Sequence, residues 1–554
     1  MIAPVGQPVP DTPHAVSVSL PTWKANVGYE EGEDWVISAM QTGYPRFFVH
    51  LTIQELEREV LSQYGKEGER VTLFPSRRAA RRCYDFFRDK RPELDGVRLL
   101  HLEPDDSKGK AVGPQNSSHH DLFSKGPKRY QRGASQHSFS YPDELPATNG
   151  AKTNGHAESQ DFAQFVEERF GRNLNAQLAT KAKLAVRRRI AGCLTTNVEL
   201  EDGLEASNSD QKQEEQQLDV PEARLRNVSE SDVYLYPTGM SSIFEAHQSA
   251  MAISQKRTGQ RLRSICFGFP YIDTLKVLEK WGPGALFYGK GVEEDLDDLE
   301  RRLESGERFA SLFTEFPSNP LLRSPDLARI RQLADKYDFA VVIDETVGNY
   351  ININVLPYAD IIVSSLTKIF SGDSNVMGGS LVLNSKSNLY SDFKQQFDQQ
   401  YEDDYWAVDA IFMERNSRDY IGRIIRINTN AEIMTNELQK SSLVKEVYYP
   451  ALVPSRKYYD ACKTTDGGYG GLFSVTFHNP EHAHQFFDNL QIQKGPSLGT
   501  NFTLSCPFVL IAHYNELDWA RSMGVDPDLV RVSVGLEDAE ELKRICRNAL
   551  VDIQ

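Results

Sequence analysis

The stretches FAVVIDETVG, residues 339–348, and ADIIVSSLTKIF, residues 359–370, decide the fold that we predict for this chain of 554 residues. Each begins with a short, mostly apolar run, over residues 339–343 and 360–364, that is typical of a strand buried on both faces of a parallel sheet. Beyond residue 232, further runs of this kind alternate with helical patterns. This alternation predicts repeated βα units and therefore an α/β fold.

Two residues with complementary chemistry follow these two strands. Asp344 comes directly after the first, and Lys368 lies four residues beyond the end of the second. Ligand chemistry in open parallel sheets gathers at the carboxyl ends of the strands. Pyridoxal 5′-phosphate (PLP) needs a lysine for its Schiff base and a carboxylate for its pyridinium nitrogen. The pair therefore predicts a PLP site.

Several motifs occur in an order that is similar to that of a known family. Residues 341–345, 364–371 and 376–383 resemble motifs of the Cys/Met-metabolism PLP enzymes, the fold-type I group that includes cystathionine γ-synthase and methionine γ-lyase. The resemblance covers about residue 161 to the C-terminus. It implies a large domain with a mostly parallel sheet, a smaller C-terminal α/β domain, and cofactor contacts from Ser365 and Thr367. The alternative, that Lys368 is a solvated loop lysine, is disfavoured by the number of motifs in family order.

A turn after the predicted strand Val233–Tyr236 is a candidate phosphate site. Thr238, Gly239 and Met240 lead into a helix predicted to begin near Ser242. Backbone N–H groups at a helix N-terminus bind phosphate because they lack acceptors and the helix dipole favours an anion. The resembled family uses a serine-glycine-methionine turn for this purpose, and Gly239 and Met240 match it. An ordinary tight turn is the alternative.

Two further residues are assigned to the cofactor ring by the resemblance. Tyr271 matches a tyrosine that stacks on the ring and exchanges protons with the leaving group, although Ile272 and Asp273 replace the family's two glycines. A buried core tyrosine is the alternative. Asn319, within residues 315–320, matches an asparagine that contacts the phenolic oxygen of the cofactor, and we expect it to border the substrate as well.

The C-terminal half contains a candidate carboxylate site. Arg531 matches the family's carboxylate-binding arginine, and Ser497 and Leu498 match its serine-leucine-glycine loop. A guanidinium group binds a carboxylate through two parallel hydrogen bonds, as an α-amino acid substrate requires. The alternative is an arginine on a surface strand.

Some positions depart from the family's pattern. Arg172 matches an arginine that reaches the PLP phosphate of a neighbouring subunit, whereas Phe170 replaces the tyrosine that accompanies it. Asp373 and Asn375 stand where the family often has histidine and aspartate. Arg172 and the prevalence of closed symmetry predict a homodimer or homotetramer.

The N-terminal region, from about residue 14 to residue 102, is predicted to form a small α/β unit. A capping box at Thr52 and Glu55 precedes a helical pattern, Val71–Phe74 has the pattern of a strand, and Ser76 is placed to cap an arginine-rich helix. We interpret the basic face of that helix as solvated or subunit-facing. Residues 16–23, together with residues 43–46, resemble the N-terminal extension of fungal cystathionine γ-synthase-like proteins, the closest members of the resembled family.

The composition of successive stretches divides the chain into five regions. Residues 105–160 are polar and poor in branched apolar side chains, so burial cannot offset their ordering entropy. The predicted regions are an N-terminal extension (1–104), a disordered linker (105–160), a helical dimer and cofactor arm (161–230) with a polar insert (199–220), a PLP-binding large domain (231–385) and a C-terminal substrate domain (386–554).

Charge and cysteine content exclude several classes of protein. A net charge of -16 and a pI near 5.3 argue against a nucleic-acid-binding surface. Six cysteines without paired spacing indicate neither a disulfide framework nor a zinc site. No stretch approaches about 18 consecutive apolar residues, so we predict a cytoplasmic protein without a membrane span that acts on small amino-acid substrates.

Together these features predict a PLP-dependent transferase. Resemblance to cystathionine γ-synthase implies γ-replacement on O-acetyl- or O-succinyl-L-homoserine, with cysteine as the incoming nucleophile and cystathionine as the product. A second hypothesis is specialised metabolism with another thiol or a carbon nucleophile, and a third is a cystathionine or methionine lyase. A non-catalytic regulatory protein is disfavoured because Asp344, Lys368 and Arg531 occur together.

Overall fold

The chain divides into two compact units in the computed structural model. The larger comprises Met1–Thr72 and Arg172–Gln554, and the smaller comprises Leu73–Gly171. The structure describes residues 2–45, 48–91, 96–100, 178–192 and 228–553. The predicted linker (105–160), the polar insert (199–220), Phe170 and Arg172 lie outside these residues.

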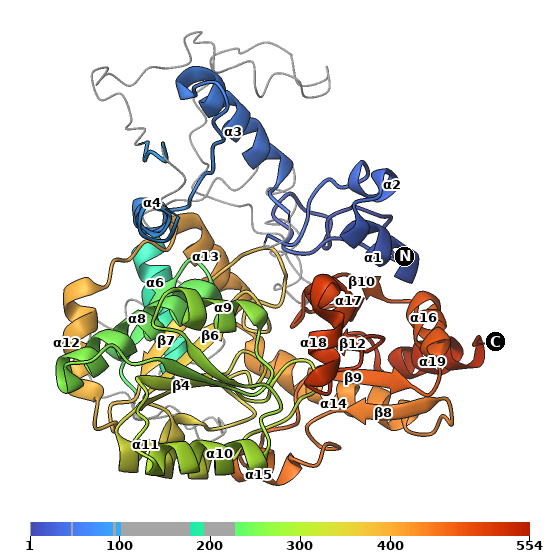
Figure 1. Ribbon diagram of the computed structural model, residues 1–554. Helices are drawn as coiled ribbons and strands as arrows, with labels where there is room; N and C mark the ends of the chain where they lie inside the picture. Colours follow the sequence, from blue (N-terminus) through green and yellow to red (C-terminus); the bar gives the residue numbers. More distant parts are fainter. Residues whose placement is uncertain (1, 46–47, 92–95, 101–177, 193–227, 554) are drawn as a thin grey trace, which may run out of the picture. The chain divides into compact units, whose positions relative to one another are not determined.

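A seven-stranded sheet forms the centre of the larger unit (Figure 1). Its strands, in sequence, are β1 (Val233–Tyr236), β2 (Ser264–Phe267), β3 (Ala285–Tyr288), β4 (Ser311–Glu315), β5 (Ala340–Asp344), β6 (Ile361–Ser365) and β7 (Gly379–Leu383). Their spatial order is β1-β7-β6-β5-β4-β2-β3, and every pairing is parallel except the two that involve β7. The mostly parallel sheet is confirmed, with β5 and β6 each displaced by one residue from the predicted strands.

Helices cover both faces of this sheet. α8 (Gly239–Thr258), α9 (Ile272–Lys280) and α12 (Tyr390–Gln400) pack on one face; α6 (Ala179–Ala191), α10 (Glu293–Glu304), α11 (Leu327–Tyr337) and α13 (Ala407–Asn416) contribute to the core on the other (Figure 1). Successive strand residues face opposite sides, so Phe313 and Val342 join the first core whereas Leu312 and Val341 join the second. Burial on both faces explains why these strands are continuously apolar.

Side-chain caps determine where two helices of this unit begin. α8 begins at Gly239 rather than near Ser242, because the Thr238 side chain caps it by accepting from the Ser241 N–H group at 3.1 Å. α11 begins after Asp326, whose carboxylate accepts from the Arg329 N–H group at 3.0 Å. In both cases the side chain that accepts the first-turn N–H determines the start.

A five-stranded sheet forms the C-terminal part of the larger unit. Its strands are β8 (Val444–Tyr448), β9 (Leu472–Phe477), β10 (Gln493–Lys494), β11 (Leu504–Pro507) and β12 (Val530–Ser533), in the spatial order β10-β11-β12-β9-β8. α14 (Tyr420–Leu438), α16 (Pro480–Asn489) and α19 (Ala539–Val551) pack against it. This part also contains α15 (Arg456–Cys462), α17 (Phe508–His513) and α18 (Leu517–Ser522).

The N-terminal part of the larger unit is helical, not α/β as predicted. It contains α1 (Trp23–Glu31), α2 (Asp34–Ile37) and α3 (Leu51–Tyr64). Residues 71–74 form no strand, because no neighbouring strand accepts their backbone hydrogen bonds within the described residues. The capping box is also wrong: the ring of His50 accepts from the Thr52 N–H group at 3.2 Å, which places Thr52 inside α3.

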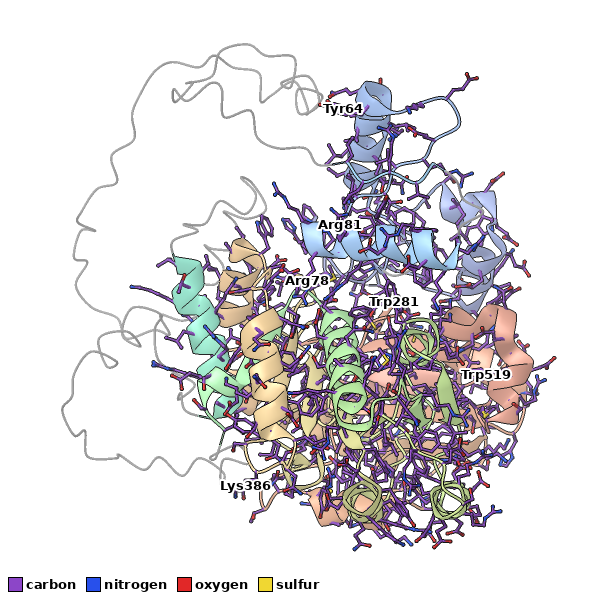
Figure 2. The ribbon with its side chains drawn as sticks, turned by 60° about the vertical axis from the view of Figure 1, so that its left-hand side comes forward. Tyr64, Arg78, Arg81, Trp281, Lys386 and Trp519 are labelled. Carbon is purple, nitrogen blue, oxygen red and sulfur yellow. The ribbon has the colours of Figure 1, made fainter. Side chains whose placement is uncertain are left out.

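The smaller unit contains α4 (Arg77–Lys90). Ser76 caps it as predicted, with its hydroxyl accepting from the Ala79 N–H group at 3.2 Å. Arg78 and Arg81 project from this helix (Figure 2). No helix within the described residues is long and apolar enough to span a membrane.

Candidate active site

A cavity of about 430 Å³ lies where β5 and β6 end. It is bordered by segments that follow strands of both sheets. Its lining includes ten of the residues predicted to form the site: Gly239, Met240, Tyr271, Asn319, Asp344, Ser365, Thr367, Lys368, Leu498 and Arg531.

Lys368 is the cationic centre of this cavity. Its side chain is buried, with 8% relative exposure, so it is not a solvated loop lysine. The ε-amine donates to the hydroxyl of Ser497 at 3.1 Å and to the hydroxyl of Tyr44 at 3.1 Å. No carboxylate forms an ion pair with it among the described residues. The amine is therefore held by neutral acceptors that leave its nitrogen available for chemistry.

Asp344 and Glu315 form a pair of buried carboxyl groups beside the cavity. They are direct partners across the parallel strands β5 and β4, each at the last residue of its strand. Burial raises the pKa of Asp344, while burial and the charge of Asp344 together raise the pKa of Glu315. No cationic side chain forms an ion pair with either group within the described part of the chain. A cationic ring nitrogen next to Asp344 would stabilise its ionised form.

Glu315 connects two of the residues predicted to contact the cofactor. Its two carboxylate oxygens accept hydrogen bonds from the backbone N–H groups of Tyr271, at 2.5 Å, and Asn319, at 3.1 Å. Tyr271 immediately precedes α9, and Asn319 follows β4. One buried carboxylate thus fixes the backbone at both positions.

The start of α8 supplies a site for an anion. The hydroxyl of Thr238 accepts a hydrogen bond from the Ser241 N–H group. The N–H groups of Gly239 and Met240 lack intrahelical acceptors, as at any helix start. A side chain at position 239 would not fit, because its Cβ atom would lie 2.8 Å from the Cβ atom of Ser365. The glycine therefore allows α8 to approach the end of β6 and opens its N-terminus to the cavity.

Arg531, which also lines the cavity, is held by neutral groups. The side chain, on β12, is 3% exposed, so it is not a surface arginine. Its guanidinium group donates to the side-chain oxygen of Asn319 at 3.1 Å and to the carbonyl oxygens of Pro496 and Ser497 at 2.8 and 2.9 Å. No carboxylate of the described residues neutralises this buried charge. An α-carboxylate is the chemical group that would complete such a site.

The arrangement fits PLP. The cavity combines an anion site at a helix start, a buried acid that no cationic side chain of the described residues pairs with, and a lysine amine with neutral partners. These are the groups that a phosphate, a pyridinium nitrogen and a lysine-linked carbonyl require.

Some predicted positions contribute less than expected to the cavity surface. The hydroxyl of Thr367 is occupied by the backbone of Gly378, to which it donates at 3.3 Å and from which it accepts at 3.1 Å. Neither Asp373 nor Asn375 lines the cavity. The carboxylate of Asp373 accepts a hydrogen bond from the side-chain amide of Asn501 at 2.6 Å. Among the departures from the family pattern, Ile272 and Asp273 do line it.

Two parts of the site were missed by the sequence interpretation. Glu315 was recognised only as a motif residue, although its position at a strand end beside Asp344 was a usable signal. Val16, Tyr44 and Pro45 line the cavity from the N-terminal region, and no periodic pattern marks them. The only sequence signal for Tyr44 was the likeness of its segment to fungal relatives.

Comparisons with known proteins agree with this chemistry. A family model described as Cys/Met metabolism PLP-dependent enzyme matches residues 217–551, and one for the N-terminal domain of fungal trans-sulfuration enzymes matches residues 52–131. A cystathionine γ-synthase of Neurospora crassa is 46% identical, covering 99% of this chain and 98% of that protein. A cystathionine γ-synthase-like enzyme of Amanita muscaria is 40% identical, with coverage of 99% and 98%.

A solved structure shares the fold. A Campylobacter jejuni protein described as an O-acetylhomoserine (thiol)-lyase superposes with a TM-score of 0.50 and 20% identity, covering 58% of this chain and 82% of that one. That structure carries a pyridoxyl-lysine phosphate. The predicted α/β fold class of fold-type I PLP enzymes is therefore confirmed.

Proposed function

Because the chain belongs to the Cys/Met-metabolism PLP-dependent enzymes, we propose that it replaces the acyloxy group at Cγ of an O-acyl-L-homoserine, O-acetyl or O-succinyl, with the thiol of cysteine to form cystathionine. The observation that carries this proposal is the meeting of Lys368, Asp344 and Arg531 at one cavity. The name of the Neurospora crassa relative supports the choice of reaction.

The residues that would hold PLP come from the carboxyl ends of several strands of the seven-stranded sheet and from the start of α8. Lys368 would bind its carbonyl carbon, Asp344 its ring nitrogen, and the N–H groups of Gly239 and Met240 its phosphate. By resemblance, Tyr271 would cover the ring and Asn319 would contact the phenolic oxygen. PLP supplies an electron sink that stabilises negative charge at the substrate's α-carbon.

The protein's own side chains would orient the substrate and move its protons. Arg531 would bind the α-carboxylate through its guanidinium fork and so direct the α-carbon toward Lys368. The amine of Lys368, once displaced by the substrate's amino group, would take the proton from Cα and then act at Cβ. Removal of the Cβ proton and departure of the acyloxy group as a carboxylate would leave Cγ open to the thiol.

A different nucleophile is the second candidate. Ile272 and Asp273 line the cavity in place of the family's two glycines, so the space available to the nucleophile differs from the family pattern. The Amanita muscaria relative is named a cystathionine γ-synthase-like enzyme, and this name does not specify its nucleophile. Another thiol or a carbon nucleophile would then replace cysteine, and a cystathionine or methionine lyase is the remaining alternative.

We further propose a homodimer or homotetramer in which Arg172 reaches the PLP phosphate of the neighbouring subunit.

The role of Lys368 is tested with PLP-free protein. Addition of PLP should give a yellow protein, and borohydride reduction should fix the cofactor to the peptide that contains Lys368. Lys368→Ala should lose the visible band and turnover while keeping the far-ultraviolet circular dichroism of the wild type. A fully active Lys368→Ala protein would disprove the assignment.

The choice of nucleophile is tested by product analysis. Each acyl-homoserine is offered with cysteine, with sulfide and with a β-keto acid, and the products are identified by mass spectrometry. Cystathionine as the dominant product supports the proposal, and a carbon-linked product supports the specialised alternative. If neither acyl-homoserine is consumed while cystathionine or methionine is cleaved, the protein is a lyase.

A further inference from the structure

The N-terminal segment, residues 2–45, forms part of the cavity wall. Val16, Tyr44 and Pro45 line the same cavity as Lys368. The hydroxyl of Tyr44 accepts a hydrogen bond from the ε-amine of Lys368 at 3.1 Å, and the centre of its ring lies 4.8 Å from that nitrogen. The regions matched by the family models begin at residue 52, so this contact comes from a segment that precedes both.

We propose that Tyr44 is an active-site residue that holds the amine of Lys368 and makes the N-terminal segment a built-in wall of the catalytic cavity. The inference rests on the proposed role of Lys368 as the PLP lysine.

The N-terminal segment is firmly attached to the rest of the larger unit. The Val16 N–H group donates to the carbonyl oxygen of Ser374 at 2.8 Å, only a few residues beyond Lys368. The Trp23 N–H group donates to the carboxylate of Asp488 at 2.6 Å, and its ring stacks on that of His484 with 3.9 Å between the centroids. These contacts are spaced along the segment, so its path is determined by α16 and the loop after β6.

Apolar burial supports the same path. Val18, Leu20, Val36 and Met40 are buried in one core cluster with Phe508, a residue that also lines the cavity. Burying each side chain contributes about 1.5–3 kcal/mol relative to exposure. A segment with four such side chains in a shared core does not leave the cavity readily.

The backbone around Tyr44 is constrained as well. The Gln41 N–H group donates to the carbonyl oxygen of Gly6 at 2.9 Å, and the Phe48 N–H group donates to the carbonyl oxygen of Tyr44 at 3.0 Å. Gly43 is buried, and a Cβ atom there would lie 2.2 Å from the Cβ atom of Phe48. The phenol is therefore presented to Lys368 from a fixed position.

The hydroxyl and the ring of Tyr44 can both hold the ε-amine of Lys368 in its charged form. A tyrosine hydroxyl accepts from an ammonium group, and the face of its ring attracts the same positive charge. Tyr44 and Ser497 hold the amine from two distant parts of the chain. Without the hydroxyl of Tyr44, the amine would sample more orientations, and each step that needs it at a defined position would slow.

The test compares Tyr44→Phe and Tyr44→Ala with wild-type protein and with Tyr64→Phe. Tyr64 lies at the end of α3 with 46% relative exposure, so its variant controls for the loss of a tyrosine hydroxyl elsewhere in the N-terminal part (Figure 2). PLP is added to PLP-free protein, and the rate at which the visible band appears is measured by stopped flow. The values of kcat and KM for O-acetyl-homoserine with cysteine are measured in parallel.

Loss of the hydroxyl in Tyr44→Phe should lower the rate of band formation and kcat by about tenfold each. A tenfold change corresponds to the loss of about one hydrogen bond to a charged group. Thermal midpoint and KM should change little, because the ring and its packing remain. Tyr44→Ala should lose more, because the ring is lost too. Tyr64→Phe should match the wild type.

The outcomes separate this inference from the proposed function. If wild-type protein forms no visible band, the proposed role of Lys368 fails. If the wild type forms the band and Tyr44→Phe forms it at the same rate with unchanged kcat, the inference about Tyr44 is overturned. A lowered thermal midpoint with wild-type band kinetics would show a purely structural role and would overturn it as well.

Discussion

Replacing Gly499 with alanine is expected to damage the cofactor site through the backbone of Lys368. Gly499 has φ of +68°, and a Cβ atom there would lie 2.5 Å from the backbone nitrogen of Ile369 and 3.0 Å from the carbonyl carbon of Lys368. Both neighbours are backbone atoms at the base of the lysine. They cannot rotate away, so the segment that carries Lys368 must shift.

The magnitude has two parts, one of which can be measured separately. An alanine in the left-handed region costs about 1–2 kcal/mol, and overpacking against a buried neighbour costs a further ~1–3 kcal/mol. Gly259, at the end of α8, has φ of +73° and no atom within 4 Å of its built Cβ position. Gly259→Ala therefore carries the first cost alone and is the matched control.

Urea unfolding and PLP titration of the two PLP-free variants provide the assay. Gly259→Ala should show a small loss of stability and wild-type PLP affinity. Gly499→Ala should be less stable than the control by about 1–3 kcal/mol and should bind PLP at least about tenfold more weakly, because the lysine is displaced. Equal stability and equal PLP affinity in the two variants would refute the packing argument.

Two further predictions concern the charged groups of the cavity. Arg531→Lys should raise KM for the amino-acid substrate by roughly 10–100-fold, because an ammonium group cannot bind a carboxylate through a planar fork; a wild-type KM would contradict carboxylate binding. Burial and the charge of Asp344 raise the pKa of Glu315 from its ordinary 4.5 to about 8 in the folded protein. Binding of a proton by Glu315 therefore stabilises the folded state; the contribution is complete below pH 4.5 and is lost as the pH rises through 8. Stability of PLP-free protein should fall across that window, and Glu315→Gln should flatten the fall in pH-dependent urea unfolding; an identical pH profile would argue against it.

Patterns of neighbouring residues in the sequence predicted the strands and the cofactor motifs. The continuous apolar runs before Asp344 and Lys368 predicted β5 and β6 to within one residue, because a strand buried on both faces needs apolar side chains at successive positions. The same short-range logic identified β1 at the observed residues. It failed at residues 71–74, where a strand-like composition has no partner strand within the described part of the chain.

The pairing of Glu315 with Asp344 shows where local patterns stop. Each residue was visible at the end of an apolar run, but their adjacency depends on β4 and β5 being neighbours in register. That register follows from how the helices pack on the sheet, which no single run specifies. The raised pKa of both carboxyl groups is a consequence of this adjacency and of burial.

The sequence by itself determined the α/β class, the order of the cofactor motifs and the residues that compose them, because these depend on side chains close together in the chain. Only the tertiary structure decided that Tyr44 touches Lys368 across 324 positions, and that an N-terminal region expected to be α/β is helical. Such contacts arise from the summed burial of apolar side chains such as Leu20 and Met40 in a distant core. Burial of that kind leaves no periodic signal around the residue that it positions.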